Sequence, residues 1–146
     1  MKPKQLLPAN QPLQGKRLKL ERLSAAHVDY LLETHKNEGF WQSYRHHEDR
    51  SISREVLVER LDFESQKTPQ AVGKMEWVVC ELSGPEPRPI GFAALTAWNQ
   101  SQLRAEYLIG IVDKADITNG LGLETSLLVF DFAFNHSGLN KLVSPE

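Results

Sequence analysis

The sequence has little of three things that would assign it to a special class of protein. It holds a single cysteine, Cys80, among 146 residues, so no disulfide can form within one chain and a reducing cytoplasm is the expected location. The formal net charge is only -2, with both signs interspersed, which gives no electrostatic footprint for nucleic acid or a lipid surface. The longest apolar run, 126–134, is interrupted by Asp131 and falls far short of the roughly 20 residues of a membrane span. The first residues also lack the apolar core and cleavage site of a signal peptide. Neither nucleic acid nor a membrane is therefore an expected partner.

What is present is the composition of an ordinary soluble domain. Hydrophobic residues make up 40% and charged residues 25% of the chain, close to the averages for globular proteins, which excludes disorder and fibrous repeats. The length allows one domain with a real core and not two. Residues 1–15 contain three prolines and little periodicity, so we expect an N-terminal arm followed by a single domain over 16–146.

The domain begins with the pattern of a strand and a helix. Alternation of apolar and charged residues over 16–21 predicts a short strand with one buried face. Ser24 is a suitable N-cap for a helix whose apolar positions from Val28 to His35 recur at helical spacing. Gly39 is the expected stop of this helix.

A loop, a second helix and three strands follow. The stretch 40–50 is polar and aromatic without a period, which indicates a loop, and a second helix is expected to begin near Ser53. Residues 75–80 alternate with period two until a turn that three prolines enforce. The runs 90–98 and 103–112 are joined by a short turn. Together the three runs predict an antiparallel meander.

The last third predicts a polar loop, a long helix and the start of one more strand. The loop covers 113–119, the helix follows Gly120-Leu-Gly122 and ends at Gly138, and the strand covers 139–143. The fold class is therefore α/β (α+β), with a mixed, largely antiparallel central sheet flanked by helices. The expected buried face of the long helix consists of large apolar residues at helical spacing: Leu123, Leu127, Phe130 and Phe134, widened by Leu128 and Phe132.

The Gly-x-Gly turn before the long helix is the segment most informative about chemistry. Glycines let the backbone approach a ligand, and the first amides of a helix are unpaired donors at the positive end of its dipole. Such a place suits a phosphate or pyrophosphate. A tight turn without a ligand has the same pattern, and the two common nucleotide fingerprints are missing from the sequence.

The order of these elements resembles the GNAT superfamily of acyl-CoA-dependent N-acyltransferases, in particular the branch that acetylates the N-terminal alanine of ribosomal proteins. Three segments carry the resemblance: 88–95 as a strand, 113–124 as a pyrophosphate loop, and 132–142 as a helix end and the following strand. The resemblance covers Lys16 to the C-terminus. It implies an enzyme that moves an acetyl group from acetyl-CoA to a primary amine, on a protein N-terminus or a small molecule, by direct attack in a ternary complex.

The resemblance also implies which residues contact acetyl-CoA. The pantetheine arm would lie along the backbone of Ile111 and Val112. The pyrophosphate would rest on the backbone amides of Asn119, Gly120, Leu121, Gly122 and Leu123. One departure from the family pattern is Ile117, which stands where the family has Gln or Arg. Because the loop lacks that side-chain donor, we expect weaker binding of acetyl-CoA, with a dissociation constant above the low micromolar range.

Glu106 is the candidate catalytic residue. Attack by an amine requires a general base, and the resembling branch often carries a glutamate on this strand. That glutamate stands six residues before the Asp that opens the loop, a place held here by Tyr107. A one-residue bulge would turn Glu106 toward the cofactor groove, whereas an unbulged strand would direct it to the other face of the sheet. The alternatives are a solvated strand charge or a pair with Arg104 for Glu106, and a core aromatic for Tyr107.

By the same resemblance, two segments border the acceptor site. The candidate acceptor-binding residues are Trp41, Tyr44, His46 and His47, with Trp98 and Asn99. A core tryptophan and a turn asparagine explain Trp98 and Asn99 equally well. The adjacent residues of 46–49 have metal-ligand types, but they lack a spacing that converges on one ion, so we expect a solvated loop and no metal. Cys80 lies in an alternating strand and is expected to be a buried small hydrophobe.

A second interpretation keeps the fold without the activity. A non-catalytic GNAT-like ligand- or protein-binding module is favoured by Ile117, by the offset of Glu106 and by the end of the chain soon after the start of the fifth strand of that fold. The resembling fold continues with a further helix and two strands, so the C-terminal part is expected to be missing. A homodimer that completes the sheet is one expected consequence. The sequence leaves the acceptor amine and the activity of this form open.

Overall fold

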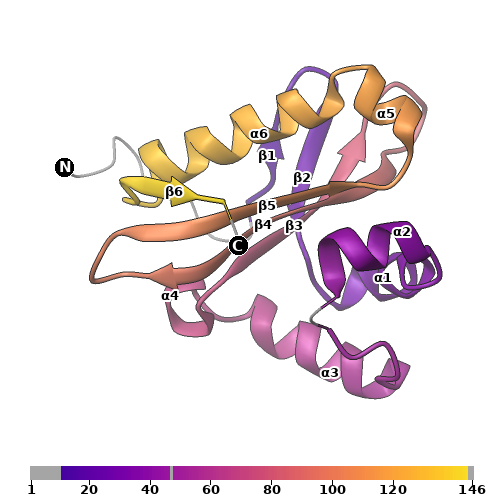
Figure 1. The fold of residues 1–146 in the computed structure, drawn as a ribbon, viewed down its shortest axis with the longest axis horizontal. Helices are drawn as coiled ribbons and strands as arrows, with labels where there is room; N and C mark the ends of the chain where they lie inside the picture. The colour runs from indigo at the N-terminus through magenta and orange to yellow at the C-terminus, as the bar shows by residue number, and fades with distance from the viewer. Residues whose placement is uncertain (1–10, 47, 145–146) are drawn as a thin grey trace.

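The computed structural model describes residues 11–46 and 48–144. These residues form a six-stranded sheet with helices on both faces (Figure 1). The strands follow the order β1-β2-β3-β4-β5-β6, and all neighbours are antiparallel except β5 and β6, which are parallel. This is the mixed, largely antiparallel sheet predicted from the sequence. The strands are β1 (Leu13–Gln14), β2 (Leu18–Arg22), β3 (Met75–Glu81), β4 (Arg88–Asn99), β5 (Arg104–Ile111) and β6 (Lys141–Val143).

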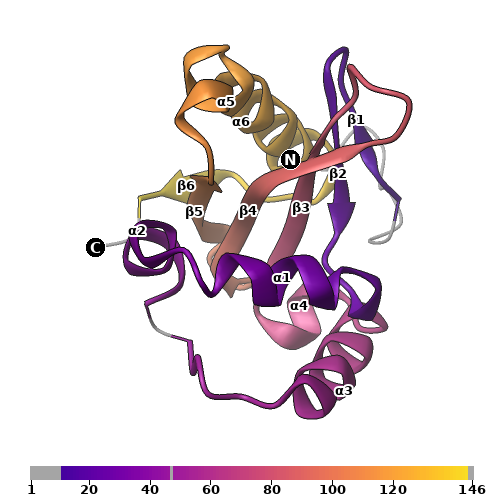
Figure 2. The ribbon, with the colours of Figure 1, turned by 90° about the vertical axis from the view of Figure 1, so that its right-hand side faces the viewer.

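The helices form two layers, one on each face of the sheet, as the two views in Figures 1 and 2 show. One layer precedes β3 in the chain and the other follows β5. The first comprises η1 (Ala25–His27), α1 (Val28–Thr34), α2 (Glu38–Phe40), η2 (Trp41–Arg45), α3 (Arg54–Ser65) and α4 (Pro69–Val72). The second comprises α5 (Lys114–Thr118), α6 (Leu121–Asp131) and η3 (Phe132–His136).

The first helix begins where the sequence predicts and ends earlier. Ser24 caps it: the side chain accepts from the amide of Ala26. The expected stop at Gly39 is wrong, because α1 ends at Thr34 and Gly39 lies inside the short helix α2. Asn37 starts α2 by accepting the amide of Phe40 with its side chain, so a local cap replaces the glycine as the boundary signal.

The expected loop over 40–50 is wrong in its first half. Residues Trp41–Arg45 form a π-helical turn, η2, which continues directly from α2 and buries Trp41, Tyr44 and Arg45. The buried positions do recur at helical spacing, but one of them is Arg45, so the short segment shows no apolar stripe that would identify a helix from sequence. The second helix, α3, begins at Arg54 after the N-cap Ser53, as predicted.

The predicted meander is confirmed, and its register decides which side chains share a face. Between β4 and β5 the pairing runs without interruption from Gly91 opposite Ile111 to Thr96 opposite Glu106. The register then shifts between Thr96 and Asn99, so the bulge lies in β4 and not in β5. Ala97 within the bulge has φ 48, a left-handed conformation that is uncommon for residues other than glycine.

The predicted buried face of the long helix is wrong for three of its six residues. Leu123, Leu127 and Phe134 are exposed, with relative accessibilities of 68%, 59% and 42%. The helix is apolar around most of its circumference, so the sequence gives no strong preference for one face. Phe132 is buried as predicted, and Leu128 packs partly against the core. The other buried side chains on this side are Leu121, Thr125, Val129 and Ala133. The preceding segment 113–119, expected as a polar loop, contains the short helix α5.

Each face of the sheet carries its own core. Trp77, Val79 and Leu95 belong to the core beneath α6, whereas Val78 and Phe92 belong to the core beneath α1 and α3. Leu13, placed in the N-terminal arm by the sequence, lies on β1 and is buried in the first of these cores. Over the described parts of the chain, no helix combines the length and hydropathy needed to cross a membrane.

Candidate functional site

A cavity of about 670 Å³ lies between η2 and the strands β4 and β5, on the face of the sheet away from α6. Side chains of η2 and the residues just after it form one wall, and β3, β4 and β5 form the other. The lining residues are Ser43, Tyr44, Arg45, His46, Glu48, Lys74, Glu76, Ala94, Thr96, Ala97, Glu106 and Leu108.

Glu106 faces this cavity. Because β5 has no bulge between Glu106 and Ile111, successive side chains alternate strictly between the two faces of the sheet. Leu108 therefore points to the same face as Glu106, and both line the cavity. Tyr107 points the other way, packs edge-on against Phe130 at 5.1 Å between ring centroids, and shares a hydrogen bond of 2.7 Å with Ser126. The offset of one residue thus directs the carboxylate toward η2 and the tyrosine toward α6.

The structure brings together only some of the predicted acceptor residues. Tyr44 and His46 line the cavity with Glu106. Trp41 does not line it: its ring is buried, with His35 edge-on at 4.8 Å and the Arg50 guanidinium at 4.5 Å. Trp98 belongs to the core under α6, and the Asn99 side chain accepts hydrogen bonds from Ser101 and Gln102 within a turn. His47 lies outside the described residues.

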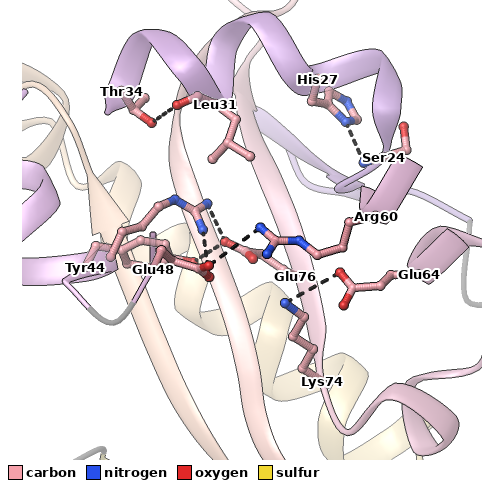
Figure 3. A network of polar contacts seen from close by, with 11 residues as sticks. Ser24, His27, Leu31, Thr34, Tyr44, Glu48, Arg60, Glu64, Lys74 and Glu76 are labelled. Atoms are coloured by element: carbon pink, nitrogen blue, oxygen red, sulfur yellow. Dashed lines mark hydrogen bonds and ion pairs between the residues drawn. The ribbon is translucent and has the colours of Figure 1, made fainter. Parts of the chain in front are cut away.

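A buried ion pair that the sequence does not reveal joins η2 to the sheet. The guanidinium of Arg45 donates from Nη2 to Oε2 of Glu76 at 2.6 Å, and the Tyr44 hydroxyl donates to the same oxygen at 2.9 Å. Both charged side chains are buried, with 5% and 9% of their surface exposed. The Arg45 guanidinium also lies over the ring of Phe92 at 4.4 Å. Figure 3 shows this network with its extension through Glu48 to α3.

The ion pair fixes the protonation state of Tyr44. Burial and the neighbouring Glu76 carboxylate raise the pKa of the Tyr44 hydroxyl well above its usual value. Tyr44 therefore keeps its proton and holds it on Glu76, so its role at the cavity wall is positional.

A second hollow, of about 260 Å³, lies on the opposite face of the sheet beside the start of α6. Three residues from the predicted cofactor set, Ile111, Gly122 and Leu123, line it together with Ile109, Ile117 and Ser126. Ile109 and Ile111 alternate along β5 with Leu108, which lines the large cavity. The same strand thus contributes to both hollows, one on each face.

The edge of β5 between the two hollows carries no strand in the described part of the chain. The parallel strand β6 pairs only with Arg104, Ala105 and Glu106, so the stretch from Tyr107 to Ile111 has an open edge. Outward-facing amides and carbonyls on such an edge are available to an extended ligand. Val112, the second residue predicted for the pantetheine arm, already donates its amide to the carbonyl of Ile90.

The start of α6 offers fewer free amides than the sequence suggests. The amides of Asn119 and Gly120 donate to Ala115 and Ile117 in the preceding turn. The amides of Leu121, Gly122 and Leu123 belong to the first turn of α6 and have no acceptor within the helix. A Cβ built at Gly122 would meet nothing within 4 Å, so the backbone there is open. Three amides, not five, form the donor set.

Arg17, on the loop before β2, is a cation near this helix start that sequence reasoning missed. Its Nε donates to Glu124 at 2.9 Å and its Nη1 donates to the carbonyl of Asn119 at 2.8 Å. Burial raises the pKa of Glu124, but these hydrogen bonds outweigh it and hold the pKa below its usual value. The contact spans 107 residues, so no local pattern could have indicated it. Arg17 thus places a guanidinium beside the helix start, where Glu124 neutralises its charge.

No grouping of three or more His, Cys, Asp or Glu side chains suited to a metal ion occurs among residues 11–46 and 48–144. Cys80 is buried in β3, and burial with the nearby Glu21 raises the pKa of its thiol to about 11, so it is not a reactive thiolate.

The mixed six-stranded sheet with helices on both faces and an open edge on β5 is consistent with the GNAT fold of acyl-CoA-dependent N-acyltransferases. The chain belongs to this family, because the family model described as the acetyltransferase (GNAT) domain matches residues 17–145. The match confirms the activity expected from the sequence, with acetyl-CoA as the acetyl donor.

Solved structures support the same fold. A spermidine N-acetyltransferase from Vibrio cholerae in complex with CoA and spermine shares 22% identity at a TM-score of 0.63, over 88% of this chain and 70% of that chain. A protein assigned as a ribosomal-protein-serine acetyltransferase from Vibrio cholerae shares 16% identity at a TM-score of 0.65, over 93% and 74%. A GNAT-family protein from Chromobacterium violaceum shares 16% identity at a TM-score of 0.64, over 93% and 68%. A search of curated proteins gives no significant match.

Proposed function

We propose that acetyl transfer takes place across the open edge of β5, with the acetyl donor on the α6 side and the acceptor amine in the large cavity. The observation that carries this proposal is the alternation along β5, where Ile109 and Ile111 line the smaller hollow and Glu106 and Leu108 line the cavity. An extended arm lying on that edge reaches both faces of the sheet within a few residues.

The residues beside the smaller hollow fit acetyl-CoA. The free amides of Leu121, Gly122 and Leu123 suit a pyrophosphate at the positive end of α6, and the open backbone from Tyr107 to Ile111 suits the amides of a pantetheine arm. Acetyl-CoA supplies the acetyl group as a thioester. The amides of Asn119, Gly120 and Val112, also predicted to contact acetyl-CoA, already donate to carbonyls of the chain. These three residues would therefore contact acetyl-CoA without donating a hydrogen bond from the backbone.

Glu106 is the proposed general base. A primary amine is protonated at neutral pH and must lose a proton before its nitrogen can attack the thioester carbon. The Glu106 carboxylate attracts the ammonium group into the cavity and accepts that proton, directly or through one water. The new C–N bond then replaces the C–S bond, and the sulfur leaves as CoA thiolate, which takes up a proton.

The test compares Glu106→Gln with Glu59→Gln, a matched change on the exposed side of α3. We expect Glu106→Gln to lower kcat by about 10²–10⁴-fold, the usual contribution of a general base, with no change in the calorimetric affinity for acetyl-CoA. The Glu59 variant should keep full activity. Release of CoA thiol reports turnover. A Glu106→Gln enzyme with normal kcat would remove Glu106 from this role, and the absence of heat on addition of acetyl-CoA would refute the site.

The acceptor is either a protein N-terminus or a small-molecule amine. The resemblance to the ribosomal-protein branch supports the first, and a neighbour that holds CoA and spermine supports the second. The alternative of a non-catalytic binding module is favoured by Ile117, which is exposed where the family has a polar donor. Binding of acetyl-CoA without acetylation of any amine in a broad panel would support that alternative.

A cytoplasmic location and a homodimer are part of the same proposal. The buried, single Cys80 supports the cytoplasm. Two exposed apolar side chains, Leu127 of α6 and Phe134 of η3, support a homodimer that covers them and extends the sheet. Light scattering at low concentration tests the dimer, and a clean monomer would contradict it.

A further inference from the structure

The charges around the large cavity nearly all neutralise one another. Three carboxylates line it, from Glu48, Glu76 and Glu106, and two basic side chains line it, from Arg45 and Lys74. His46 also lines the cavity, and a proton on its imidazole would add a third positive charge. The cavity wall therefore carries at most one net negative charge for an incoming amine to use.

Glu76 is not free to bind a ligand cation. Its Oε2 accepts from Arg45 at 2.6 Å and from Tyr44 at 2.9 Å, and the side chain is buried. Displacing Arg45 would leave a guanidinium with only 5% of its surface exposed and without its main partner.

Glu48 and Lys74 are held by partners from α3. Glu48 lies 3.9 Å from the Arg45 guanidinium and 3.7 Å from that of Arg60. Lys74 lies 3.6 Å from the Glu64 carboxylate (Figure 3). Glu48 is thus shared between two cations, and Lys74 places a positive charge on the cavity wall.

Glu106 is the exception. Among the described residues no hydrogen bond or ion pair engages its carboxylate, including the pair with Arg104 that the sequence left open. Around it the wall is uncharged, with Thr96 opposite it and with Ala94, Ala97 and Leu108. One carboxylate in an otherwise neutralised and partly apolar cavity can compensate one ammonium group. A second ammonium would meet no partner and would approach Lys74.

We infer that the acceptor of this enzyme is an amine with a single positive charge and an uncharged remainder, and that polyamines are poor substrates. The inference rests on the proposed function and names the substrate class of the same cavity. Its physical basis is the cost of placing a charge in a partly buried site without a counter-charge.

A matched pair of amines tests the inference. Pentylamine and 1,5-diaminopentane have the same carbon chain and differ by one ammonium group. With the wild-type enzyme we expect kcat/KM for pentylamine to exceed that for 1,5-diaminopentane by about tenfold or more. A short peptide amide with one free N-terminal amine, assayed beside pentylamine, distinguishes a protein terminus from a small molecule as the source of the amine.

Charge reversal on the cavity wall provides the second arm. Lys74→Glu replaces a cation of the cavity wall by a carboxylate, so the ratio of kcat/KM for 1,5-diaminopentane to kcat/KM for pentylamine should rise about tenfold. Lys36→Glu, an equal change on a side chain that is 78% exposed, should leave the ratio unaltered. Circular dichroism checks the fold of both variants.

Equal or faster turnover of the diamine by the wild-type enzyme would overturn the inference and leave the proposed function intact. Turnover of no amine, with binding of acetyl-CoA, would refute the catalytic proposal instead. In that case calorimetric binding of the two amines still decides the cavity's preference, because tighter binding of the diamine would contradict the single-charge rule.

Discussion

Removing one partner of the ion pair between Arg45 and Glu76 should be among the most destabilising polar substitutions in this protein. Both side chains are buried, their closest atoms are 2.6 Å apart, and Tyr44 adds a hydrogen bond of 2.9 Å to the same carboxylate oxygen. Arg45→Met removes one partner and leaves the Glu76 carboxylate buried with only Tyr44 to hydrogen-bond it. Breaking a buried pair in this way costs about 3–5 kcal/mol of unfolding free energy.

The companion variants separate the pair from its parts. Glu76→Gln keeps an oxygen that can accept from Tyr44 and Arg45 but removes its charge, so the loss should be smaller, about 1.5–3 kcal/mol. In the double variant Arg45→Met/Glu76→Gln no buried charge remains, so its cost should fall clearly below the sum of the single costs. Arg54→Met, which removes an exposed partner of Asp29, is the matched control and should cost little.

Equilibrium unfolding in urea, followed by tryptophan fluorescence and by circular dichroism, measures each free energy. A cost below about 1 kcal/mol for Arg45→Met, or single costs that simply add in the double variant, would refute the reasoning. The same variants should raise KM for the amine more than the dissociation constant of acetyl-CoA, because η2 forms a wall of the acceptor cavity and not of the smaller hollow.

Three further outcomes follow from other contacts. Gly110→Ala would place a Cβ 2.7 Å from the Phe40 ring and 2.8 Å from the Tyr44 ring; it should cost about 1–3 kcal/mol in urea unfolding and raise KM for the amine. Burial, with Arg45 nearby, lowers the pKa of His35, so the folded state favours its neutral form: stability should be full above pH 6.5 and decline below it, and His35→Gln should flatten that decline in pH-dependent unfolding. Ile117→Arg should tighten calorimetric binding of acetyl-CoA severalfold, because it adds a cation beside the helix start; a wild-type dissociation constant already in the low micromolar range would contradict this reasoning.

The strands were predictable because their signals are local. The alternation over 75–80 and the prolines after it specify β3 and the turn, and the short turn after β4 specifies its antiparallel partner β5. The helices were harder for two different reasons. In η2 one of the buried residues is Arg45, so no apolar stripe marks the helix, and in α6 too many apolar residues compete, so that Thr125 is buried while Leu123 is exposed.

The sequence predicted those parts of the candidate site that lie within one short segment of the chain. The helix start at Gly120 and the carboxylate at Glu106 belong to segments whose order along the chain resembles a known family. The partners that set their electrostatics do not: Arg17 reaches Glu124 across 107 residues, and Arg45 reaches Glu76 across 31. Contacts of that span depend on the completed sheet, and a single sequence carries no local sign of them.

The position of Glu106 shows how a register decides chemistry. An offset of one residue from the family's glutamate predicted either a bulge in β5 or a side chain on the wrong face, and the strand has no bulge. The resulting face is nevertheless the one that carries the large cavity, because β5 contributes odd-numbered side chains to the α6 side and even-numbered ones to the η2 side. The bulge lies instead in β4, just after Thr96, which is the residue opposite Glu106, and Ala97 within the bulge adopts a left-handed conformation on the cavity wall. The strand that carries Glu106 thus stays regular, while the irregularity falls on the neighbouring strand that lines the same cavity.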